Sequence, residues 1–226
     1  MDEPLQFSST LDPASLTSYI ATLLATHFPD GLSSAADLRP VVETALARLE
    51  DNFSRIHRKY FTVDGAARFD HLNGDHLAMF LYLLANSCWT STGDARIPTK
   101  LFSLNKILHG LDLFYSVELP ATFLLVHPVG TVIGNAEYGD YLVVYQNCTI
   151  GSESGRYPRF GEGVVLNSRV SVIGDVTVGD NVVFGANAFL LGGDVPSDSI
   201  VVGQFPTHRI LPAGRSVRDR FFDAAP

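Results

Sequence analysis

Residues 160–184 read FGEGVVLNSRVSVIGDVTVGDNVVF, and a large apolar residue returns at every sixth position of this stretch. The series is Phe160, Leu166, Val172, Val178 and Phe184, and it continues to Leu190. The same spacing runs upstream through Val126, Val132, Tyr138, Val144 and Ile150. A period of six matches neither an amphipathic helix nor a simple alternating strand. It predicts short strands joined by corners and coiled into a parallel β-solenoid, with three six-residue segments in each coil.

Two other positions of the repeat are also restricted. Four places after the large apolar residue the side chain is usually small or β-branched, as at Gly130, Ala136, Cys148, Val164, Val170, Val176, Val182 and Ala188. The place directly after it carries Gly139, Gly151, Gly161, Asn167, Gly179 and Gly185, residues that tolerate a positive φ at a corner. His127 follows Val126 and so takes the same corner position. We therefore expect its imidazole to project from the solenoid.

Composition narrows the class of protein. The chain has 226 residues, of which 46% are hydrophobic, and a net charge of −8, which disfavours a nucleic-acid partner. Its two cysteines, Cys88 and Cys148, are too few for a disulfide framework or a four-cysteine zinc site. Cys148 falls on an inward repeat position and is expected to be packed and inert. The N-terminus has no basic region before an apolar segment, and no apolar run is long enough to cross a membrane. We expect a cytoplasmic protein without membrane insertion.

The first half of the chain has helical periodicity instead. Apolar residues recur at intervals of three and four in the segments 12–28, 34–57 and 75–89. Ser34 and Asp75 are the expected N-caps, and Pro98 is expected to open a shorter helix that runs toward His109. The sequence thus predicts an α-helical N-terminal subdomain at residues 1–110, a β-helix at 111–206 and a C-terminal tail at 207–226.

Two segments depart from the six-residue register. The polar, glycine-containing stretch Ser152–Arg159 interrupts it and is predicted to form a protruding loop. Near the end, Val201–Pro206 is expected to leave the solenoid, before a short basic tail from Arg215 to Arg220.

Several stretches resemble a known family. These are residues 126–134 (VHPVGTVIG), 146–151 (QNCTIG), 161–165 (GEGVV) and 202–206 (VGQFP). They are similar to the left-handed β-helix acyltransferases, and within that group to the serine acetyltransferases. The left hand of the coil is implied by this resemblance alone. The resemblance also implies acetyl-CoA as donor, no metal, and an active site between the subunits of a homotrimer, with a hexamer left open.

The resemblance assigns roles to individual residues. His127 matches the catalytic histidine and Asp112 the aspartate that pairs with it, while Gln146, Arg156 and Tyr157 fall on positions near the acceptor. The positions along the CoA groove are Gly151, Ser152, Gly185 and Ala186, and the candidate phosphate partners by charge are Arg156, Arg159, Arg169 and Arg209. A neutral imidazole is well suited to remove the proton of an alcohol at neutral pH, and a carboxylate is suited to fix its tautomer. Direct attack on the thioester is then expected, without an acyl-enzyme.

The acceptor is less well defined, because two positions depart from the serine acetyltransferases. Val126 stands where that family has an aspartate that helps hold serine, and Tyr157 replaces a histidine in the loop. Four tyrosines are available to stack on a sugar or to cover apolar surface: Tyr115, Tyr141, Tyr145 and Tyr157. We therefore expect O-acetylation of a sugar or polysaccharide precursor. The alternatives are serine O-acetylation, N-acetylation of a nucleotide amino sugar, and a non-catalytic scaffold. The γ-type carbonic anhydrases share the fold but need three histidines, and His127 is the only one between Leu111 and Thr207.

Overall fold

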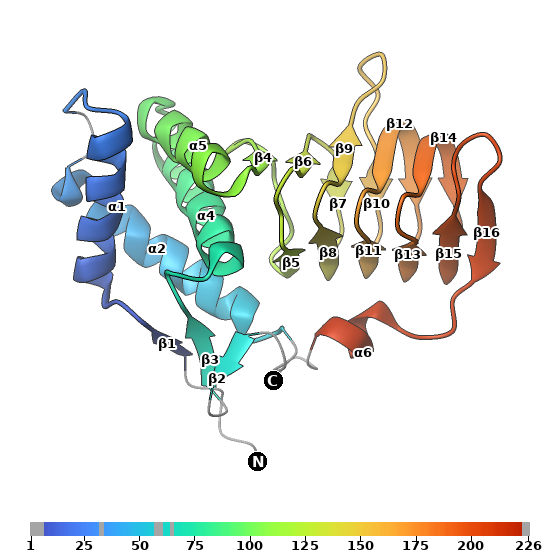
Figure 1. The fold of residues 1–226 in the computed structure, drawn as a ribbon, viewed down its shortest axis with the longest axis horizontal. Helices are drawn as coiled ribbons and strands as arrows, with labels where there is room; N and C mark the ends of the chain where they lie inside the picture. The colour runs from blue at the N-terminus through green and yellow to red at the C-terminus, as the bar shows by residue number, and fades with distance from the viewer. Residues whose placement is uncertain (1–6, 32–33, 57–60, 64–65, 223–226) are drawn as a thin grey trace.

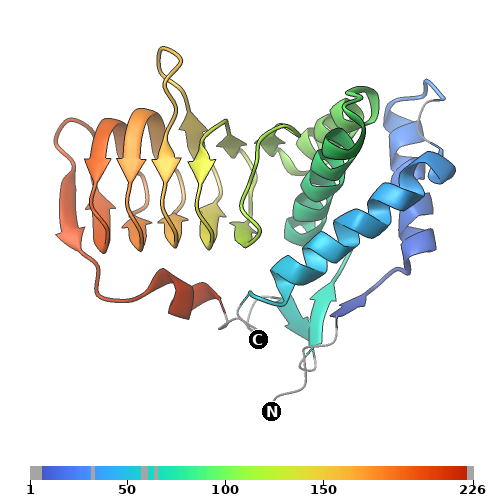
Figure 2. The same ribbon diagram turned by 180° about the vertical axis from the view of Figure 1, so that it is seen from behind.

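The computed structural model describes residues 7–31, 34–56, 61–63 and 66–222. A helical region at the N-terminal end abuts one end of a β-solenoid (Figures 1 and 2). The helices are α1 (Pro13–His27), α2 (Ala35–Phe53), α4 (Gly74–Thr92) and α5 (Arg96–His109). A small sheet, which the sequence did not predict, joins them, with strands β1 (Phe7–Ser9), β2 (Thr62–Val63) and β3 (Ala66–Phe69) in the order β1-β3-β2. None of the helices in the described ranges combines the length and hydropathy needed to cross a lipid bilayer.

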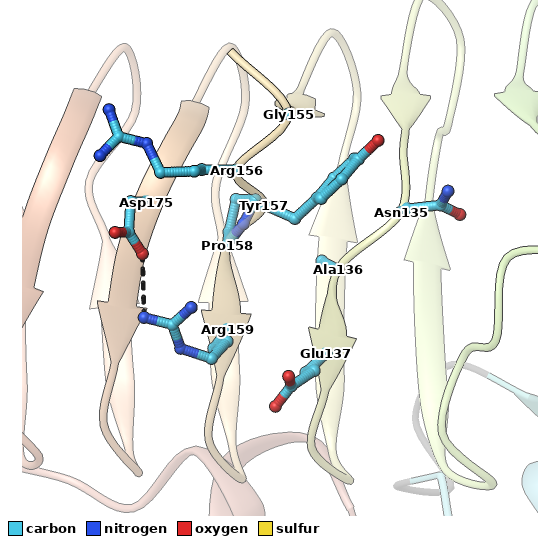
Figure 3. Close-up of a pocket in the computed structure, with 9 residues that line it drawn as sticks. All are labelled: Asn135, Ala136, Glu137, Gly155, Arg156, Tyr157, Pro158, Arg159 and Asp175. Carbon is cyan, nitrogen blue, oxygen red and sulfur yellow. Dashed lines mark hydrogen bonds and ion pairs between the residues drawn. The ribbon is translucent and has the colours of Figure 1, made fainter. Parts of the chain in front are cut away.

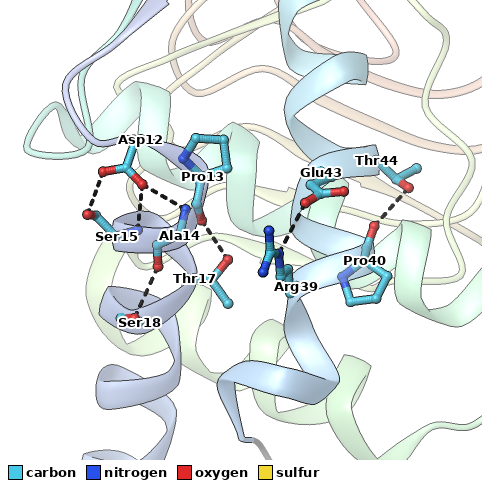
Figure 4. A network of polar contacts seen from close by, with 10 residues as sticks. All are labelled: Asp12, Pro13, Ala14, Ser15, Thr17, Ser18, Arg39, Pro40, Glu43 and Thr44. Carbon is cyan, nitrogen blue, oxygen red and sulfur yellow. Dashed lines mark hydrogen bonds and ion pairs between the residues drawn. The ribbon is translucent and has the colours of Figure 1, made fainter.

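Polar side chains fix the starts of three helices. Asp12 caps α1 by accepting hydrogen bonds from the backbone N–H groups of Ala14 and Ser15 (Figure 4). Ser34 caps α2 as expected, in a capping box with Asp37. The prediction for α4 was wrong, because Asn73 is the N-cap and Asp75 lies in the first turn. The short polar side chain of Asn73 reaches the N–H groups of residues 75 and 76 and leaves the carboxylate of Asp75 available for other contacts.

The core of the helical region contains a buried histidine. His76 on α4 is 5% exposed, stacks on Phe61 with ring centroids 4.5 Å apart, and accepts a hydrogen bond at Nδ1 from the backbone N–H of Asp70. Its Nε2 is buried and has no hydrogen-bond partner among the residues that the structure describes. Burial lowers the pKa of His76 from 6.5 to about 4. The imidazole is therefore neutral at physiological pH and serves as a core residue, so it does not line a cleft.

This histidine should make the fold sensitive to acid. Between pH 6.5 and about 4 the unfolded chain binds a proton at position 76 that the folded chain does not, so the free energy of unfolding falls as the pH falls. The loss attributable to His76 is at most roughly 3 kcal/mol. Urea unfolding of wild type and His76→Leu at pH 7, 5.5 and 4.5 measures it. We expect a shallower pH dependence in the variant, whereas parallel curves would contradict a neutral buried imidazole.

The solenoid has three faces. Face A consists of β4 (Asp112–Leu113), β6 (Val132–Ile133), β9 (Thr149–Gly151) and the first parts of β12 (Ser171–Val178) and β14 (Phe189–Val195). Face B consists of β7 (Glu137–Tyr138), β10 (Arg159–Phe160) and the second parts of β12 and β14. Face C consists of β5 (Phe123–Val126), β8 (Leu142–Tyr145), β11 (Val164–Leu166), β13 (Val182–Phe184) and β15 (Ser199–Val202). All pairs between successive coils are parallel.

The three edges of this prism carry the turns between faces. The first corner leads from face C to face A, the second from A to B, and the third from B to C. The loop predicted at Ser152–Arg159 lies at the second corner, between β9 and β10, and protrudes from the solenoid (Figure 1); Arg159 is already the first residue of β10. The repeat residues from Val144 onward are buried as expected, with exposures between 0% and 5% from Val144 to Leu190.

The predicted register was wrong in the first coil. Leu125 pairs with Val144 and Ile133 with Ile150, so these two residues, and not Val126 and Val132, point inward. Seven positions separate Leu125 from Val132, whereas five separate their partners Val144 and Thr149. Two extra residues therefore bulge at the first corner of this coil. Val132 is 40% exposed as a result.

The glycines that follow the large apolar residues serve a different purpose from the one expected. Gly139, Gly161 and Gly179 do not have a positive φ. A Cβ on Gly139 would lie 2.5 Å from the backbone carbonyl carbon of Gly161, and one on Gly179 would lie 2.5 Å from the backbone nitrogen of Ser197. These glycines are needed because neighbouring coils approach closely there. The positive φ angles occur two or three residues further on, for example at Tyr141, Asn147 and Asn181.

The chain does not leave the solenoid where the sequence suggested. Val201 lies inside β15 and is fully buried, and β16 (Arg209–Pro212) then returns antiparallel to β15. The following basic segment forms helix α6 (Val217–Phe221), which runs back along the third corner toward the helical region (Figure 2). The backbone N–H of Val217 donates to Asn181 Oδ1 at 2.9 Å. We call residues 213–222 the C-terminal arm.

The arm covers an apolar outer surface. Leu124, Val143 and Val165 are the outward residues of three face C strands, yet each is at most 1% exposed. They belong to one buried cluster with Val217, Phe221 and Phe222 of the arm. Phe222 also forms a β-bridge with Ile56, which follows α2. The arm thus links the far coils of the solenoid to the helical region.

Candidate functional site

His127 stands on the bulge at the first corner of the first coil. The two extra residues push this turn outward, and His127 adopts a left-handed backbone with φ 49°. Its side chain is 73% exposed, so the imidazole projects as expected. The bulge faces the N-terminal end of α4. There the backbone N–H of His127 donates to Asp75 Oδ2 at 3.0 Å, and Nδ1 of its ring lies 3.2 Å from the same oxygen.

Asp112, the expected partner of His127, is engaged elsewhere. It begins β4 directly after α5, where its backbone pairs with face A opposite Val132. Its carboxylate accepts a hydrogen bond from Lys106 Nζ at 2.6 Å. In the described part of the chain, the carboxylate that contacts His127 is that of Asp75. The sequence missed Asp75 because its position near a helix start suggested only a capping role.

Gln146 and the pair Gly185-Ala186 follow His127 along the first corner, in the second and fourth coils. The spacing of about 4.8 Å between paired strands puts Ala186 roughly 14 Å from the His127 coil. Gln146 is half-buried, and its Oε1 has no hydrogen-bond partner among the described residues. A Cβ on Gly185 would lie 3.2 Å from Val202 Cγ1, so a larger residue there would crowd the next coil. Ala186 is exposed.

Of the remaining predicted residues, Gly151, Ser152, Arg156, Tyr157 and Arg159 lie at or beside the second corner. Ser152, Arg156 and Tyr157 are exposed, and the last two line a groove of about 470 Å³ beneath the protruding loop (Figure 3). Arg159, on β10, also lines this groove and pairs with Asp175 at 2.9 Å. Arg156 lies 3.5 Å from Glu153 within the loop. Gly151 precedes the loop, and its missing side chain leaves room for Ile173 of the next coil.

The two corners border opposite edges of face A. β9 (Thr149–Gly151) runs from the first corner, which holds Asn147, to the second corner, which begins at Ser152. One chain therefore does not bring Arg156 and Tyr157 to the His127 imidazole. A site that uses both corners needs two chains.

The four candidate tyrosines differ in how deeply their side chains are buried. Tyr115 is 6% exposed and packs on Trp89 and Phe114, and Tyr141 packs on Phe222 with Arg218 above its ring. Tyr145 is half-buried. Tyr157 is 42% exposed and alone among the four lines the groove. Packing therefore accounts for Tyr115 and Tyr141.

Among the other histidines, His109 lies beside the start of α4. It ends α5, with its Nδ1 2.8 Å from Asn105 Oδ1, and burial lowers its pKa. Its Cδ2 would lie 3.7 Å from a Cβ on Gly74, the residue before Asp75. His71 pairs with Thr10, and His57 lies outside the described residues. Both cysteines are buried, and burial raises the pKa of the Cys148 thiol, in line with an inert residue.

Comparison with known proteins agrees with the hexapeptide-repeat fold described above. Residues 157–192 match the family described as bacterial transferase hexapeptide (six repeats). The serine acetyltransferase of Synechococcus elongatus is 38% identical over 112 residues, which are 47% of this chain and 46% of that protein. That of Staphylococcus xylosus is 29% identical over 187 residues, which are 78% of this chain and 82% of that protein. The chain thus spans less than half of the first relative and most of the second.

Solved structures share the fold. Serine acetyltransferase from Vibrio cholerae superposes with a TM-score of 0.69 at 21% identity, covering 90% of this chain and 82% of that one. A serine acetyltransferase solved in complex with CoA superposes with a TM-score of 0.67 at 18% identity, covering 89% and 86%. The expected fold class, a left-handed parallel β-helix with an N-terminal helical subdomain, is confirmed. The chain is similar to hexapeptide-repeat proteins of the β-helix acyltransferase type. Within that type it is most similar to the serine acetyltransferases.

Proposed function

We propose that the chain is an acetyl-CoA-dependent serine O-acetyltransferase. The observation that carries this proposal is the similarity to the serine acetyltransferase of Staphylococcus xylosus along most of both chains. An exposed imidazole at the first corner of the first coil supports it, because acyl transfer to an alcohol needs a base at an open surface.

The acceptor in this proposal differs from our first expectation of a sugar. The similarity to serine acetyltransferases favours the serine alternative, and nothing in the comparisons supports a role in polysaccharide biosynthesis. The substitutions at Val126 and Tyr157 remain the observations that favour another acceptor. A sugar or an amino sugar is therefore the second candidate.

In the proposed reaction, His127 Nε2 removes the proton of the acceptor hydroxyl while its oxygen attacks the thioester carbonyl of acetyl-CoA. Backbone N–H groups stabilise the oxyanion, and the thiolate of CoA leaves and takes up the proton from the imidazolium. We assign Gln146, Arg156 and Tyr157 to the acceptor side. Ser152 and Ala186, which are exposed, are the proposed contacts of CoA, with Gly151 and Gly185 beside them.

The proposed unit is a homotrimer in the cytoplasm, where acetyl-CoA is available. Two observations support self-association. Two of the proposed acceptor residues, Arg156 and Tyr157, lie at a different corner of the chain from His127, and face A exposes the apolar side chains of Val132 and Leu191. A second copy placed against face A brings one chain's second corner near the other's first corner.

The test is release of CoA from acetyl-CoA by the purified protein with L-serine as sole acceptor. We expect saturable turnover with serine and none with nucleotide sugars or free hexoses. Turnover of a sugar or an amino sugar without turnover of serine would overturn the serine proposal in favour of the second candidate. Failure to bind acetyl-CoA would overturn the enzyme proposal.

A further inference from the structure

Asp75 connects the helical region to the corner that carries His127. It lies in the first turn of α4, and its carboxylate is 52 positions away in sequence from the residue it contacts, His127. One oxygen, Oδ2, accepts the backbone N–H of His127 at 3.0 Å and lies 3.2 Å from Nδ1 of the same residue. A single carboxylate oxygen thus fixes both the turn and the ring.

The contact leaves the other ring nitrogen available. With Oδ2 beside Nδ1, the favoured neutral tautomer carries its proton on Nδ1 and has a lone pair on Nε2. The 3.2 Å between His127 Nδ1 and Asp75 Oδ2 is an ion-pair distance. Hydrogen bonds of catalytic histidines often shorten only when substrate binds. Because the side chain is 73% exposed, Nε2 is accessible to an acceptor.

Asp75 is itself held in place. Its backbone N–H donates to Asn73 Oδ1 at 3.0 Å, and its side chain is 23% exposed. A carboxylate in the first turn of a helix is stabilised by the positive end of the helix dipole. These contacts hold the Asp75 carboxylate beside His127. The carboxylate of Asp112 is paired instead with Lys106 Nζ at 2.6 Å.

We propose that Asp75 is the positioning residue of His127, in the role that the resemblance gave to Asp112. The inference rests on the proposed acetyl transfer. During that reaction the acceptor proton moves to Nε2, the new C–O bond forms, and the C–S bond to CoA breaks. The proton on Nδ1 stays with the imidazolium, whose positive charge the Asp75 carboxylate stabilises. The proton on Nε2 then passes to the leaving thiolate.

The test compares Asp75→Asn with Asp112→Asn, and uses Asp94→Asn as a matched control. Asp94 is an exposed carboxylate just beyond the opposite end of α4, paired with Arg96 at 2.5 Å. We expect Asp75→Asn to lower kcat about tenfold or more, with the KM values for serine and acetyl-CoA changed less than about twofold. Asp94→Asn should match wild type. A larger kcat loss in Asp112→Asn than in Asp75→Asn would overturn the proposal, and so would a loss confined to KM.

A second readout does not depend on activity. In ¹⁵N-histidine NMR spectra, with the His127 signals assigned by their absence in His127→Ala, wild type should show the Nδ1-protonated tautomer. Asp75→Asn should shift His127 toward the Nε2-protonated tautomer. An unchanged tautomer in Asp75→Asn would overturn the positioning role. If no acceptor is acetylated but the tautomer changes as expected, the proposed function fails while the structural pairing stands.

Discussion

Replacing His127 by alanine should lower kcat for acetylation of serine by about 10²–10⁴-fold, the usual contribution of a general base. The fold should not change, because the side chain is 73% exposed and the ion pair it forms is with Asp75. Initial rates of CoA release at saturating acetyl-CoA measure the effect. Circular dichroism and sedimentation of the same preparation show whether the secondary structure and the oligomeric state are intact.

His27→Ala is the matched control for this variant. His27 is also an exposed histidine, at the end of α1, and its Nδ1 contacts only the carbonyl of Leu23. We expect its kcat to equal that of wild type. A His127→Ala protein that keeps the kcat of wild type would contradict the role of His127, whatever the acceptor.

Phe221→Ala should destabilise the protein by about 3–5 kcal/mol, the range measured for truncation of a buried phenylalanine. Phe221 is 1% exposed and belongs to the buried cluster that includes Leu124, Val143 and Val165 on the outside of face C. Its truncation leaves a cavity under the C-terminal arm and weakens the hold of α6. Equilibrium unfolding in urea measures the free-energy change.

Phe205→Ala is the control for this second prediction. It removes the same side chain from a site that is 42% exposed, and it should change the free energy of unfolding by no more than about 0.5 kcal/mol. Equal losses in the two variants would show that the arm does not bury the outer surface of face C.

The repeat pattern predicted the solenoid well from Val144 onward, where the six-residue spacing is broken only by the loop after Ile150. It failed in the first coil because both Leu125 and Val126 are apolar, as are Val132 and Ile133. The pattern alone cannot tell which of two adjacent apolar residues points inward. The bulge that presents His127 was therefore hidden, although the projection of its side chain was predicted.

The sequence did contain a signal for the arm. The face C strands are apolar at consecutive positions, as in Leu142–Val144 and Val164–Leu166, and a solvated solenoid face would alternate with polar residues. Continuous apolar strands indicate burial on both sides. The C-terminal arm that covers them lies some 50 to 80 residues later in the sequence. Because the arm contains several arginines, the sequence predicted a solvated tail there.

The candidate site was predicted in part. The motif around His127 identified that residue, but its contact with Asp75 depends on how α4 packs against the first coil. No local pattern encodes a contact over 52 positions. The repeat itself places Arg156 and Tyr157 apart from His127, because with three segments in each coil Ile150 lies four repeats after Val126 and so precedes the next corner.

The C-terminal arm also sets the length of the solenoid. A repeat protein can ordinarily gain or lose a coil, because each coil contacts only its neighbours. Here the arm spans from the last strands to Ile56 in the helical region and docks on Asn181 along the way. One added coil would lengthen that span by about 4.8 Å and pull Phe222 away from Ile56. The length of the arm therefore limits the number of coils, and a change in coil number would require a matching change in the length of the arm.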